Sequence, residues 1–200
     1  TAHYLLSEYR KIGKKDVVLI HAAAGGVGLL LVQWAKHLGA TVIGTVSTPE
    51  KAVVAREAGA DHAIVYTTQD FVAETKRITG GGGAHLILDG VGKTTFPGNI
   101  EAASMRGHIV IFGAASGPAD PIVPNALMTK SLSVSGGTLF YFAATHKDIV
   151  RRSRDVLKGI AKGWLKLRID RVLPLAEAGE AQRLLESRAT TGKLVLKVAD

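Results

Sequence analysis

The sequence predicts an α/β fold: a doubly wound, parallel, six-stranded sheet with helices on both faces, followed by a C-terminal helix-strand extension. Short runs rich in valine and isoleucine alternate with amphipathic or polar stretches, which is the pattern of successive βαβ units. The runs are mostly apolar, as strands covered on both faces are. A turn rich in alanine and glycine follows the first run. The runs expected to be strands are 17–21, 41–46, 62–66, 85–89, 108–113 and 131–136.

Helices are expected between these runs and ahead of the first one. The opening residues predict a helix that ends at Gly13. The later helices are expected at residues 26–39, 49–59, 69–79 and 93–105. In the first of these, an apolar stripe on one helical face is expected to pack on the sheet. The stripe consists of Val27, Leu30, Leu31, Trp34 and Leu38.

The chain is expected to divide after residue 145. Residues 1–145 predict the α/β core, and residues 146–200 predict C-terminal helices and a strand. Within that second part we expect a long basic helix, a short strand near 169–173, a helix at 175–187 and a final strand, GKLVLKV. No hairpin neighbour for the final strand is evident, so it is expected to pair with a sheet outside this chain.

Composition places the chain among ordinary globular proteins, with 46% hydrophobic and 21% charged residues. No apolar run is long enough to span a membrane, and the first residues resemble neither a signal nor a transit peptide. The absence of cysteine excludes disulfides and thiolate zinc sites from this chain. These features fit a cytoplasmic location, which we expect.

The formal net charge is +8, so an anionic partner has to be considered. The clearest basic run, residues 151–168, is interpreted as a solvated helix face because no RNA- or DNA-binding motif accompanies it. Nucleic acid is therefore an unexpected partner, and an anionic cofactor would account for part of the excess charge. The histidines are scattered without metal-ligand spacing, so no metal site is expected.

The turn AAAGGVG follows an expected strand and opens an expected helix, which is the context of a dinucleotide-binding turn. Its spacing is Ala23-x-Gly25-x-x-Gly28, with alanine in place of the usual first glycine. In Rossmann-type folds such glycines allow a tight turn, close approach of a pyrophosphate and close helix–strand packing. The helix N-terminus also favours an anion. The alternative is a helix start packed tightly on its strand, but the further βα repeats favour nucleotide binding.

No acidic residue follows the second expected strand, although NAD sites use one there, about 20 residues beyond the glycines, to bind ribose hydroxyls. Ser47 stands at that place, Lys51 follows it, and Glu50 is free to point outward from the next helix. A serine and a lysine would accept a 2′-phosphate, which a carboxylate would repel. Lys51 alone could be a solvated helix lysine. Together with the missing acid, these residues predict NADP(H) rather than NAD(H).

Several motifs together resemble the zinc-independent quinone oxidoreductases of the medium-chain dehydrogenase/reductase superfamily, on the zeta-crystallin-like branch. They are HAAAGGVG, QWAKHLGATVIGTV, AGADHAIVY, DGVG, FGAASG and LLESRATTGK, and they cover nearly all of the chain in order. The resemblance implies that Gly25, Gly26, Val27 and Gly28 lie along the pyrophosphate, and that Ser47, Lys51, Tyr66 and Arg188 form the 2′-phosphate and adenine end. It also implies that Val91 lines the adenosine side, that Tyr4 borders the cofactor, and that Ala115, Ser116, Gly117, Phe140, Tyr141 and Phe142 approach the nicotinamide.

Plain alternatives exist for several of these residues. Tyr66 could be an aromatic at the rim of the sheet, and Arg188 could interact with a helix dipole. The run LFYF could be core.

The resemblance implies hydride transfer from NADPH to a quinone or another α,β-unsaturated carbonyl. No acid–base pair in the chain qualifies as catalytic, so no catalytic residue is expected. The alternatives are an enoyl, alkenal or haloacrylate reductase of the same superfamily, and an NADPH-responsive module that binds RNA. A methyltransferase usually needs an acid after the second strand, and Ser47 argues against it.

Two further expectations come from the resemblance. Family members begin with a GroES-like domain that this sequence lacks, so the isolated chain is expected to bind NADPH but reduce quinones poorly. The strand near 131–136 is expected at the edge of the sheet, where unpaired backbone groups invite a second strand. Family members pair there, which predicts a homodimer.

Overall fold

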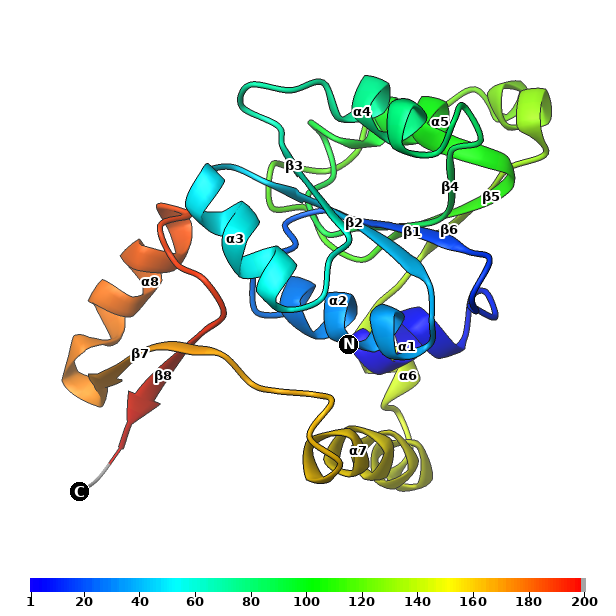
Figure 1. Cartoon of the computed structure of the whole chain (residues 1–200). Coiled ribbons are helices and arrows are strands. Elements are labelled where there is room, and N and C mark those ends of the chain that lie inside the picture. Colours follow the sequence, from blue (N-terminus) through cyan, green and yellow to red (C-terminus); the bar gives the residue numbers. More distant parts are fainter. Residues whose placement is uncertain (199–200) are drawn as a thin grey trace.

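The computed structural model describes residues 1–198 of the chain, and its core is a parallel six-stranded sheet with helices on both faces (Figure 1). The six strands are β1 (Val17–Ile20), β2 (Thr41–Val46), β3 (His62–Val65), β4 (Ala84–Asp89), β5 (Ala103–Ile111) and β6 (Ser133–Gly136). They lie in the order β3-β2-β1-β4-β5-β6. The doubly wound sheet predicted from the sequence is therefore confirmed.

Helices from two parts of the chain cover the two faces (Figure 1). One face carries α1 (Ala2–Ser7), α2 (Gly28–His37) and α3 (Pro49–Glu57), and the other carries α4 (Phe71–Ile78) and α5 (Phe96–Ala102). After β5 and a 3-10 helix, η1 (Pro124–Lys130), β6 completes the sheet, and the short α6 (Leu139–Phe142) and the long α7 (His146–Ala161) follow. Thr145 caps α7, since its side chain accepts a hydrogen bond from the backbone of Asp148. The expected domain division at this residue stays a prediction.

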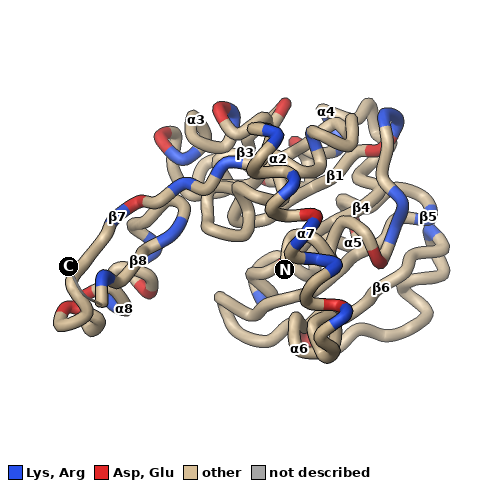
Figure 2. Tube along the Cα trace, turned by 90° about the horizontal axis from the view of Figure 1, so that it is seen from below, with Lys and Arg blue, Asp and Glu red and all other residues tan. Residues whose placement is uncertain are grey.

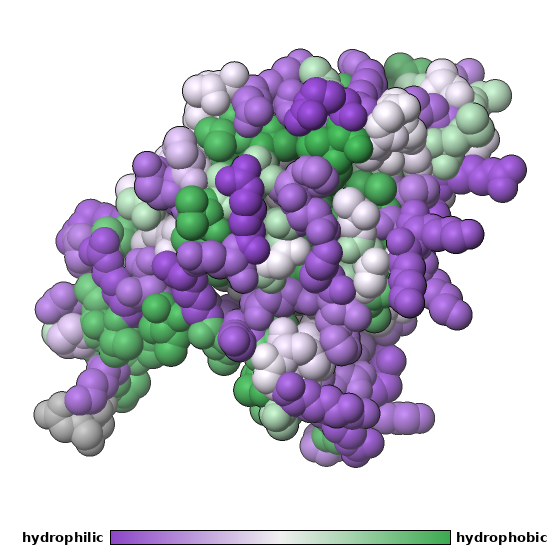
Figure 3. Space-filling model, in the orientation of Figure 1, coloured by the Kyte–Doolittle hydropathy of each residue, from purple (hydrophilic) through white to green (hydrophobic). Residues whose placement is uncertain are grey.

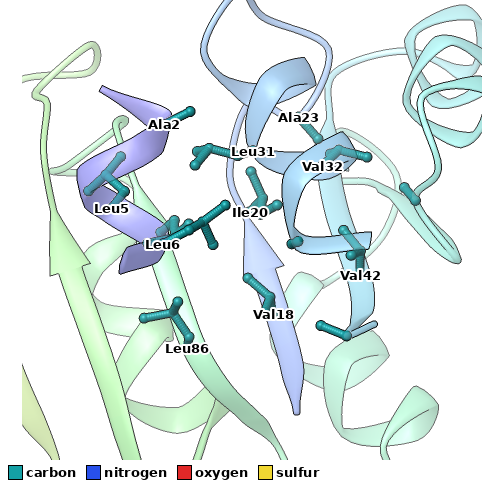
Figure 4. Close-up of a cluster of buried hydrophobic side chains, with 14 of the residues drawn as sticks. Ala2, Leu5, Leu6, Val18, Ile20, Ala23, Leu31, Val32, Val42 and Leu86 are labelled. Atoms are coloured by element: carbon teal, nitrogen blue, oxygen red, sulfur yellow. The ribbon is translucent and has the colours of Figure 1, made fainter. Parts of the chain in front are cut away.

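Successive residues of each central strand point to opposite faces of the sheet and are buried on both. Val18 and Ile20 pack with Leu31 of α2 in the cluster of Figure 4, whereas Leu19 packs with Phe96 of α5 on the other face. Val18, Leu19 and Ile20 are fully buried, and burying one such side chain contributes about 1.5–3 kcal/mol. The continuous apolar runs that predicted these strands are thus explained by two cores, one on each face.

The first helix ends at Ser7, so the prediction that it continues to Gly13 is wrong. The residues that follow reach along the sheet instead. The Tyr9 hydroxyl donates to the carbonyl of Gly136 in β6 at 2.9 Å, and Arg10 donates to a β5 carbonyl at 3.2 Å. These long-range hydrogen bonds hold the chain out of the helix, and the sequence between Ser7 and Gly13 has no breaker that would reveal it.

Two other helices differ from their predicted form. In α2, Leu31 lies in the core as expected, but Trp34 is only partly buried and packs edge-on against the rings of His3 and Trp164. The predicted stripe therefore covers α1 and the C-terminal part of the chain as well as the sheet. The helix predicted at 93–105 ends at Ala102, because β5 already begins at Ala103 with a register shift against β4.

The C-terminal part forms a small βαβ unit. A second sheet contains β7 (Ile169–Pro174) and β8 (Lys193–Lys197) in parallel, joined through η2 (Leu175–Glu177) and α8 (Ala178–Glu186). The final strand is present and pairs with β7, which is the short strand predicted near 169–173. The sequence did not reveal this pairing, since β7 mixes polar and apolar residues and only Leu173 in it is buried. Pairing of this unit with a sheet outside the chain stays a prediction. Just before β8, the backbone N–H of Gly192 donates to the carbonyl of Ala24 at 3.0 Å, and Gly192 forms a parallel bridge with Gly25.

The surface of the C-terminal unit is apolar over β7 and β8 (Figure 3). Ile169, Val172 and Val195 are all exposed there. Lysine and arginine are spread over α7 and this unit and mixed with acidic residues (Figure 2), and Arg151 and Arg152 both pair with Glu8. The basic run is thus partly neutralised within the fold.

In the part of the chain that the structure describes, no helix combines the length and the apolar character that crossing a bilayer requires. The cytoplasmic location stays a prediction.

Candidate functional site

The glycine turn between β1 and α2 is shaped by contacts with its own backbone. A Cβ on Gly28 would lie 2.2 Å from the carbonyl oxygen of Ala22 and 2.8 Å from the Cα of Ala23. Ala22 itself has a positive φ of 52°. On β2, Gly44 leaves room for the methyl group of Ala23, because a Cβ there would lie 2.6 Å from it. Any side chain at Gly28 would push the helix away from the strand, so the tight-packing interpretation accounts for this glycine.

The first turn of α2 is open to an anion. Val27 is the N-cap residue and offers no side-chain oxygen to the helix, so the first backbone N–H groups lack a side-chain cap. Together with the helix dipole, such N–H groups favour a phosphate at this end. Gly25, Gly26 and Val27 line this end of the helix, as expected for residues beside a pyrophosphate. The cradle therefore fits the diphosphate of a dinucleotide.

Four residues expected at the 2′-phosphate and adenine end gather at the carboxyl ends of β2 and β3. Ser47 follows β2, and its carbonyl accepts a hydrogen bond from the Thr67 hydroxyl at 3.0 Å. Tyr66 follows β3 and is 43% exposed, which leaves its ring available to stack on a base. The ammonium group of Lys51 donates to the carbonyl of Arg188. Residues far apart in the sequence are thus brought to one place.

Two cations and the carboxylate of Asp170 act on each other at this end. Burial lowers the pKa of Lys51, Asp170 opposes this shift, and the charge of Arg188 adds a smaller lowering. Glu50, the acid closest in sequence to Lys51, is exposed. A bound phosphate dianion would relieve the repulsion between Lys51 and Arg188, so the arrangement is suited to an anion.

A buried carboxylate organises the loop after β4. Asp89 is completely buried, and its Oδ1 accepts hydrogen bonds from the backbone of Val91 at 2.7 Å and of Gly92 at 3.0 Å. Its Oδ2 accepts from the Thr95 hydroxyl at 2.8 Å and from the side-chain amide of Asn99 at 2.6 Å. Four donors satisfy the carboxylate and fix the position of Val91, which the sequence placed beside the adenosine.

Asn99 connects this hydrogen-bond network to His21, the residue just before the glycine turn. His21 Nε2 lies 2.7 Å from Asn99 Oδ1, and Nδ1 lies 2.9 Å from the Thr45 hydroxyl. Because Asn99 Oδ1 can only accept, Nε2 carries the proton and Thr45 donates to Nδ1. Burial lowers the pKa of His21, against the opposing effects of Asp89 and the Asn99 hydrogen bond. A neutral imidazole therefore links the ends of β1, β2 and β4.

The loops after β4 and β5 are bound to each other. The backbone and the hydroxyl of Ser116 both donate to the carbonyl of Val91 at 2.8 Å. The backbone of Ala115 donates to Gly90 at 3.2 Å, and Lys93 donates to Gly117 at 3.0 Å. The expected nicotinamide segment, 115–117, thus lies against the loop that Asp89 orders.

The aromatic residues expected near the nicotinamide separate into buried and exposed ones. Tyr4 is almost completely buried and stacks on Phe142, with ring centroids 4.3 Å apart. Burial and the nearby Tyr9 raise the pKa of Tyr4 to about 12. In contrast, Phe140 and Tyr141 are 85% and 83% exposed. Tyr4 and Phe142 form one side of the core, while Phe140 and Tyr141 are free to meet a ligand or another surface.

The fold and this edge of the sheet define a Rossmann-type domain, the class that holds a dinucleotide outside the carboxyl ends of the strands. A family model described as zinc-binding dehydrogenase matches residues 26–154, and the chain belongs to that family. Among residues 1–198, no group of three or more histidine, aspartate and glutamate side chains could hold a metal ion. The residues described here therefore do not form the metal site that the family's description implies.

The comparisons confirm the resemblance stated from the sequence. The chain is 41% identical over 198 residues to a 2-haloacrylate reductase of a Burkholderia species. This alignment covers 98% of this chain and 60% of that protein. It is 39% identical over 199 residues to quinone oxidoreductase 1 of Escherichia coli. That alignment covers 98% of this chain and 61% of the E. coli protein. The chain thus spans about three fifths of the length of these relatives.

Solved structures give the same result. A mycobacterial protein complexed with NADPH superposes with a TM-score of 0.94 at 40% identity, covering 98% of this chain and 62% of the other. The E. coli quinone oxidoreductase complexed with NADPH superposes with a TM-score of 0.94 at 38% identity, covering 98% and 61%.

Sequence reasoning did not identify Asp89, Asn99 or His21 as parts of the site. A signal was available for two of them, because His21 and Asp89 are polar residues that end otherwise apolar strand runs. Polar groups at the carboxyl ends of parallel strands meet at one edge. Asn99 lies inside a helix, and nothing in its local sequence distinguishes it.

Proposed function

We propose that this chain is the NADPH-binding portion of an oxidoreductase that transfers hydride from NADPH to a quinone or another α,β-unsaturated carbonyl. The observation that carries the proposal is the arrangement at the carboxyl ends of the strands. There the N-terminus of α2 is lined by glycines and has no side-chain cap, and Lys51 and Arg188 meet after β2, where NAD sites have an acid. The NADPH complexes among the similar structures support it.

The chain's own residues would bind and orient the cofactor, and NADPH, when bound, supplies the hydride. Gly25 and Gly26, with the α2 N-terminus, would hold the diphosphate. Ser47 and Lys51 would hold the 2′-phosphate. The Asp89 network would fix the 90–93 and 115–117 loops on the nicotinamide side.

The test is a calorimetric titration of the chain with NADPH and with NADH. We expect NADPH to bind more tightly. The variant Lys51→Met should weaken NADPH binding by about 1–2 kcal/mol, since it removes a hydrogen bond to a charged group, and leave NADH unchanged. Lys162→Met, at an exposed lysine after α7, is the matched control. Equal affinities for the two dinucleotides would contradict the assignment of the 2′-phosphate site.

A reductase for 2-haloacrylate is the second candidate, because the relative at 41% identity has that activity in its name. Turnover by a full-length protein against quinones, enones and 2-haloacrylates separates the candidates. An NADPH-responsive module that binds RNA is the third candidate. Titration of the same protein with RNA at several salt concentrations tests it.

We propose that the exposed apolar face of β7 and β8 packs on the part of the full-length protein that lies outside this chain. Ile169, Val172 and Val195 on this face are between 37% and 58% exposed, and the relatives are longer than this chain. The isolated chain should then bind NADPH but reduce quinones poorly. Turnover equal to that of a full-length relative would contradict this part of the proposal.

We also propose a homodimer through the β6 edge, because the two outer edges of the sheet differ. On β3, Arg56 donates to the carbonyl of Ala63, and the Gln69 side chain accepts from the backbone of Val65. These side chains cover that edge against another strand. Along β6, within residues 1–198, only Gly136 receives such a side-chain bond to its backbone, from Tyr9.

The flanks of β6 are also apolar. Val123 and Met128 before the strand and Phe140 after it are 71%, 74% and 85% exposed. Sedimentation at several protein concentrations tests the dimer. A proline at Val134 in β6 should give a monomer, and a wild-type monomer at all concentrations would refute the proposal.

A further inference from the structure

The short helix α6 stands at the edge of the sheet where the candidate site lies. β5 and β6 run parallel, and Ile111 pairs with Gly136 at their carboxyl ends. The segments that follow these strands therefore leave the sheet at the same edge, where Rossmann-type domains bind their ligands. α6 comes shortly after β6 and exposes Phe140 and Tyr141. Two aromatic side chains are thus presented at this edge.

α6 needs support from other elements. It has four residues, far below the length of about 12–15 residues at which an isolated helix becomes stable, and Thr138 gives it no side-chain cap. It lies between α1 and α7 (Figure 1). From α7, Nε of Arg152 donates to the carbonyl of Phe142 at 2.6 Å, and the guanidinium lies 5.4 Å from the centre of the Phe142 ring. One side chain therefore holds both the last carbonyl and the last ring of α6.

Arg152 is itself buried and fixed in direction. Its Nη1 donates to Nδ1 of His3 at 3.0 Å and pairs with Glu8 at 2.8 Å. Because a guanidinium can only donate, Nδ1 of His3 accepts, and Nε2 donates to Asp155 at 2.8 Å. The imidazole of α1 is thus held between two side chains of α7. This arrangement aims Nε of Arg152 at Phe142.

The ring of Phe142 is held by α1 as well. It stacks on Tyr4 with ring centroids 4.3 Å apart and an interplanar angle of 8°. Tyr4 is almost completely buried, so it provides a fixed surface for the stack. Phe140 and Tyr141 lie on the same turn as Phe142, and their direction follows from its position.

We propose that Arg152 is a positioning residue for the nicotinamide: by holding Phe142, it orients Phe140 and Tyr141 toward the ring of the bound dinucleotide. This inference rests on the proposed function. A residue that acts in this way affects the nicotinamide end of the ligand alone, whereas a residue that only stabilises the fold affects the binding of every part of it.

Two ligands separate these roles: NADPH, and 2′-phospho-ADP-ribose, which lacks the nicotinamide. In calorimetric titrations, Arg152→Met should weaken NADPH binding by about 3- to 10-fold, because the segment is no longer held in place, and should leave 2′-phospho-ADP-ribose unchanged. Arg152→Lys keeps the charge beside Glu8, but an ammonium group cannot reproduce the directions of the guanidinium, so it should show the same selective loss. Arg154→Met, at an exposed position of the same helix, is the matched control.

Hydrogen exchange of the wild-type chain tests the inference without any variant. NADPH should slow the exchange of backbone amides in α6 and in the first half of α7, because the nicotinamide stabilises the segment that Arg152 holds. The ligand 2′-phospho-ADP-ribose should slow the exchange at the glycine turn but not in α6 or α7. This measurement also decides the matter if Arg152→Met does not fold.

The outcomes that contradict the inference are distinct from those that contradict the proposed function. Unchanged affinities in both variants, or an equal loss for both ligands, would overturn the inference and leave the proposed function standing. Full NADPH affinity in Arg152→Lys would also overturn it, since charge alone would then suffice, and so would equal exchange in α6 with the two ligands. If the wild-type chain binds neither ligand, the proposed function fails and the inference fails with it.

Discussion

The variant Asn99→Leu tests the buried network that joins the strand ends. Asn99 is completely buried, accepts the Nε2 proton of His21 at 2.7 Å and donates to Asp89 at 2.6 Å. Leucine has a similar size but can do neither. The imidazole would keep a buried donor without an acceptor, and the carboxylate would keep only Thr95 on that oxygen.

The expected loss can be worked out from these contacts. A buried donor left unsatisfied costs about 1–3 kcal/mol, and the lost hydrogen bond to a charged carboxylate costs about 1.5–3 kcal/mol. Burial of the leucine side chain returns about 1.5–3 kcal/mol. We therefore expect the free energy of unfolding to fall by about 1–3 kcal/mol, which is a sizeable part of the stability of a typical domain.

Urea unfolding with linear extrapolation measures this loss. The matched control is Asn125→Leu, the same exchange at an exposed position, which should change stability by less than about 0.5 kcal/mol. If Asn99→Leu costs no more than Asn125→Leu, the network does not contribute to stability and the reasoning is refuted.

Three further predictions concern other parts of the molecule. Because burial holds the folded-state pKa of His21 below the unfolded value of about 6.5, its stabilisation is present above that pH and is lost as the pH falls through the folded-state pKa. Urea unfolding at pH 7.5 and 5.5 should therefore show a smaller loss in His21→Gln than in wild type, and equal losses would contradict this. Gly28→Ala should lower stability by about 1–3 kcal/mol through its clash with the turn and abolish NADPH binding; Gly13→Ala, where nothing lies within 4 Å of the new methyl group, is the control. Arg152→Met should cost about 2–3 kcal/mol, because this buried side chain ties α7 to α1 and α6, whereas the exposed Arg154→Met should leave the thermal midpoint unchanged.

The parts of the fold that could be predicted are those specified by local patterns. Strands such as β1 and β4 are apolar on both faces, so each is recognisable without knowledge of its neighbours. The glycine turn is equally local, since its position between a strand and a helix is visible in the sequence. The strand order was not predicted, because right-handed connections between successive βαβ units are compatible with more than one order.

The features that were missed depend on contacts between distant residues. The end of α1 is set by the hydrogen bond of Tyr9 to β6, and β8 pairs with β7, from which η2 and α8 separate it in the sequence. Likewise, Gly26 is small because Gly192 approaches it, and no local pattern links these two glycines. The expected site residues could be chosen from the sequence, whereas their support by Asp89 and by the C-terminal segment could not.

The bridge between Gly25 and Gly192 has a consequence for how the protein is made. Gly25 and Gly192 lie 167 positions apart in the sequence, so the residue that closes the turn is translated after all six strands of the sheet. During synthesis the sheet can assemble strand by strand from the N-terminal side, since each parallel neighbour is supplied by a nearby βα unit. The turn, in contrast, is completed by a contact between residues far apart in the sequence, which forms later. Ribosome-bound chains that stop before Gly192 would therefore carry a formed sheet with an unfinished turn, and the capacity to retain the dinucleotide would be acquired only after this residue has been added.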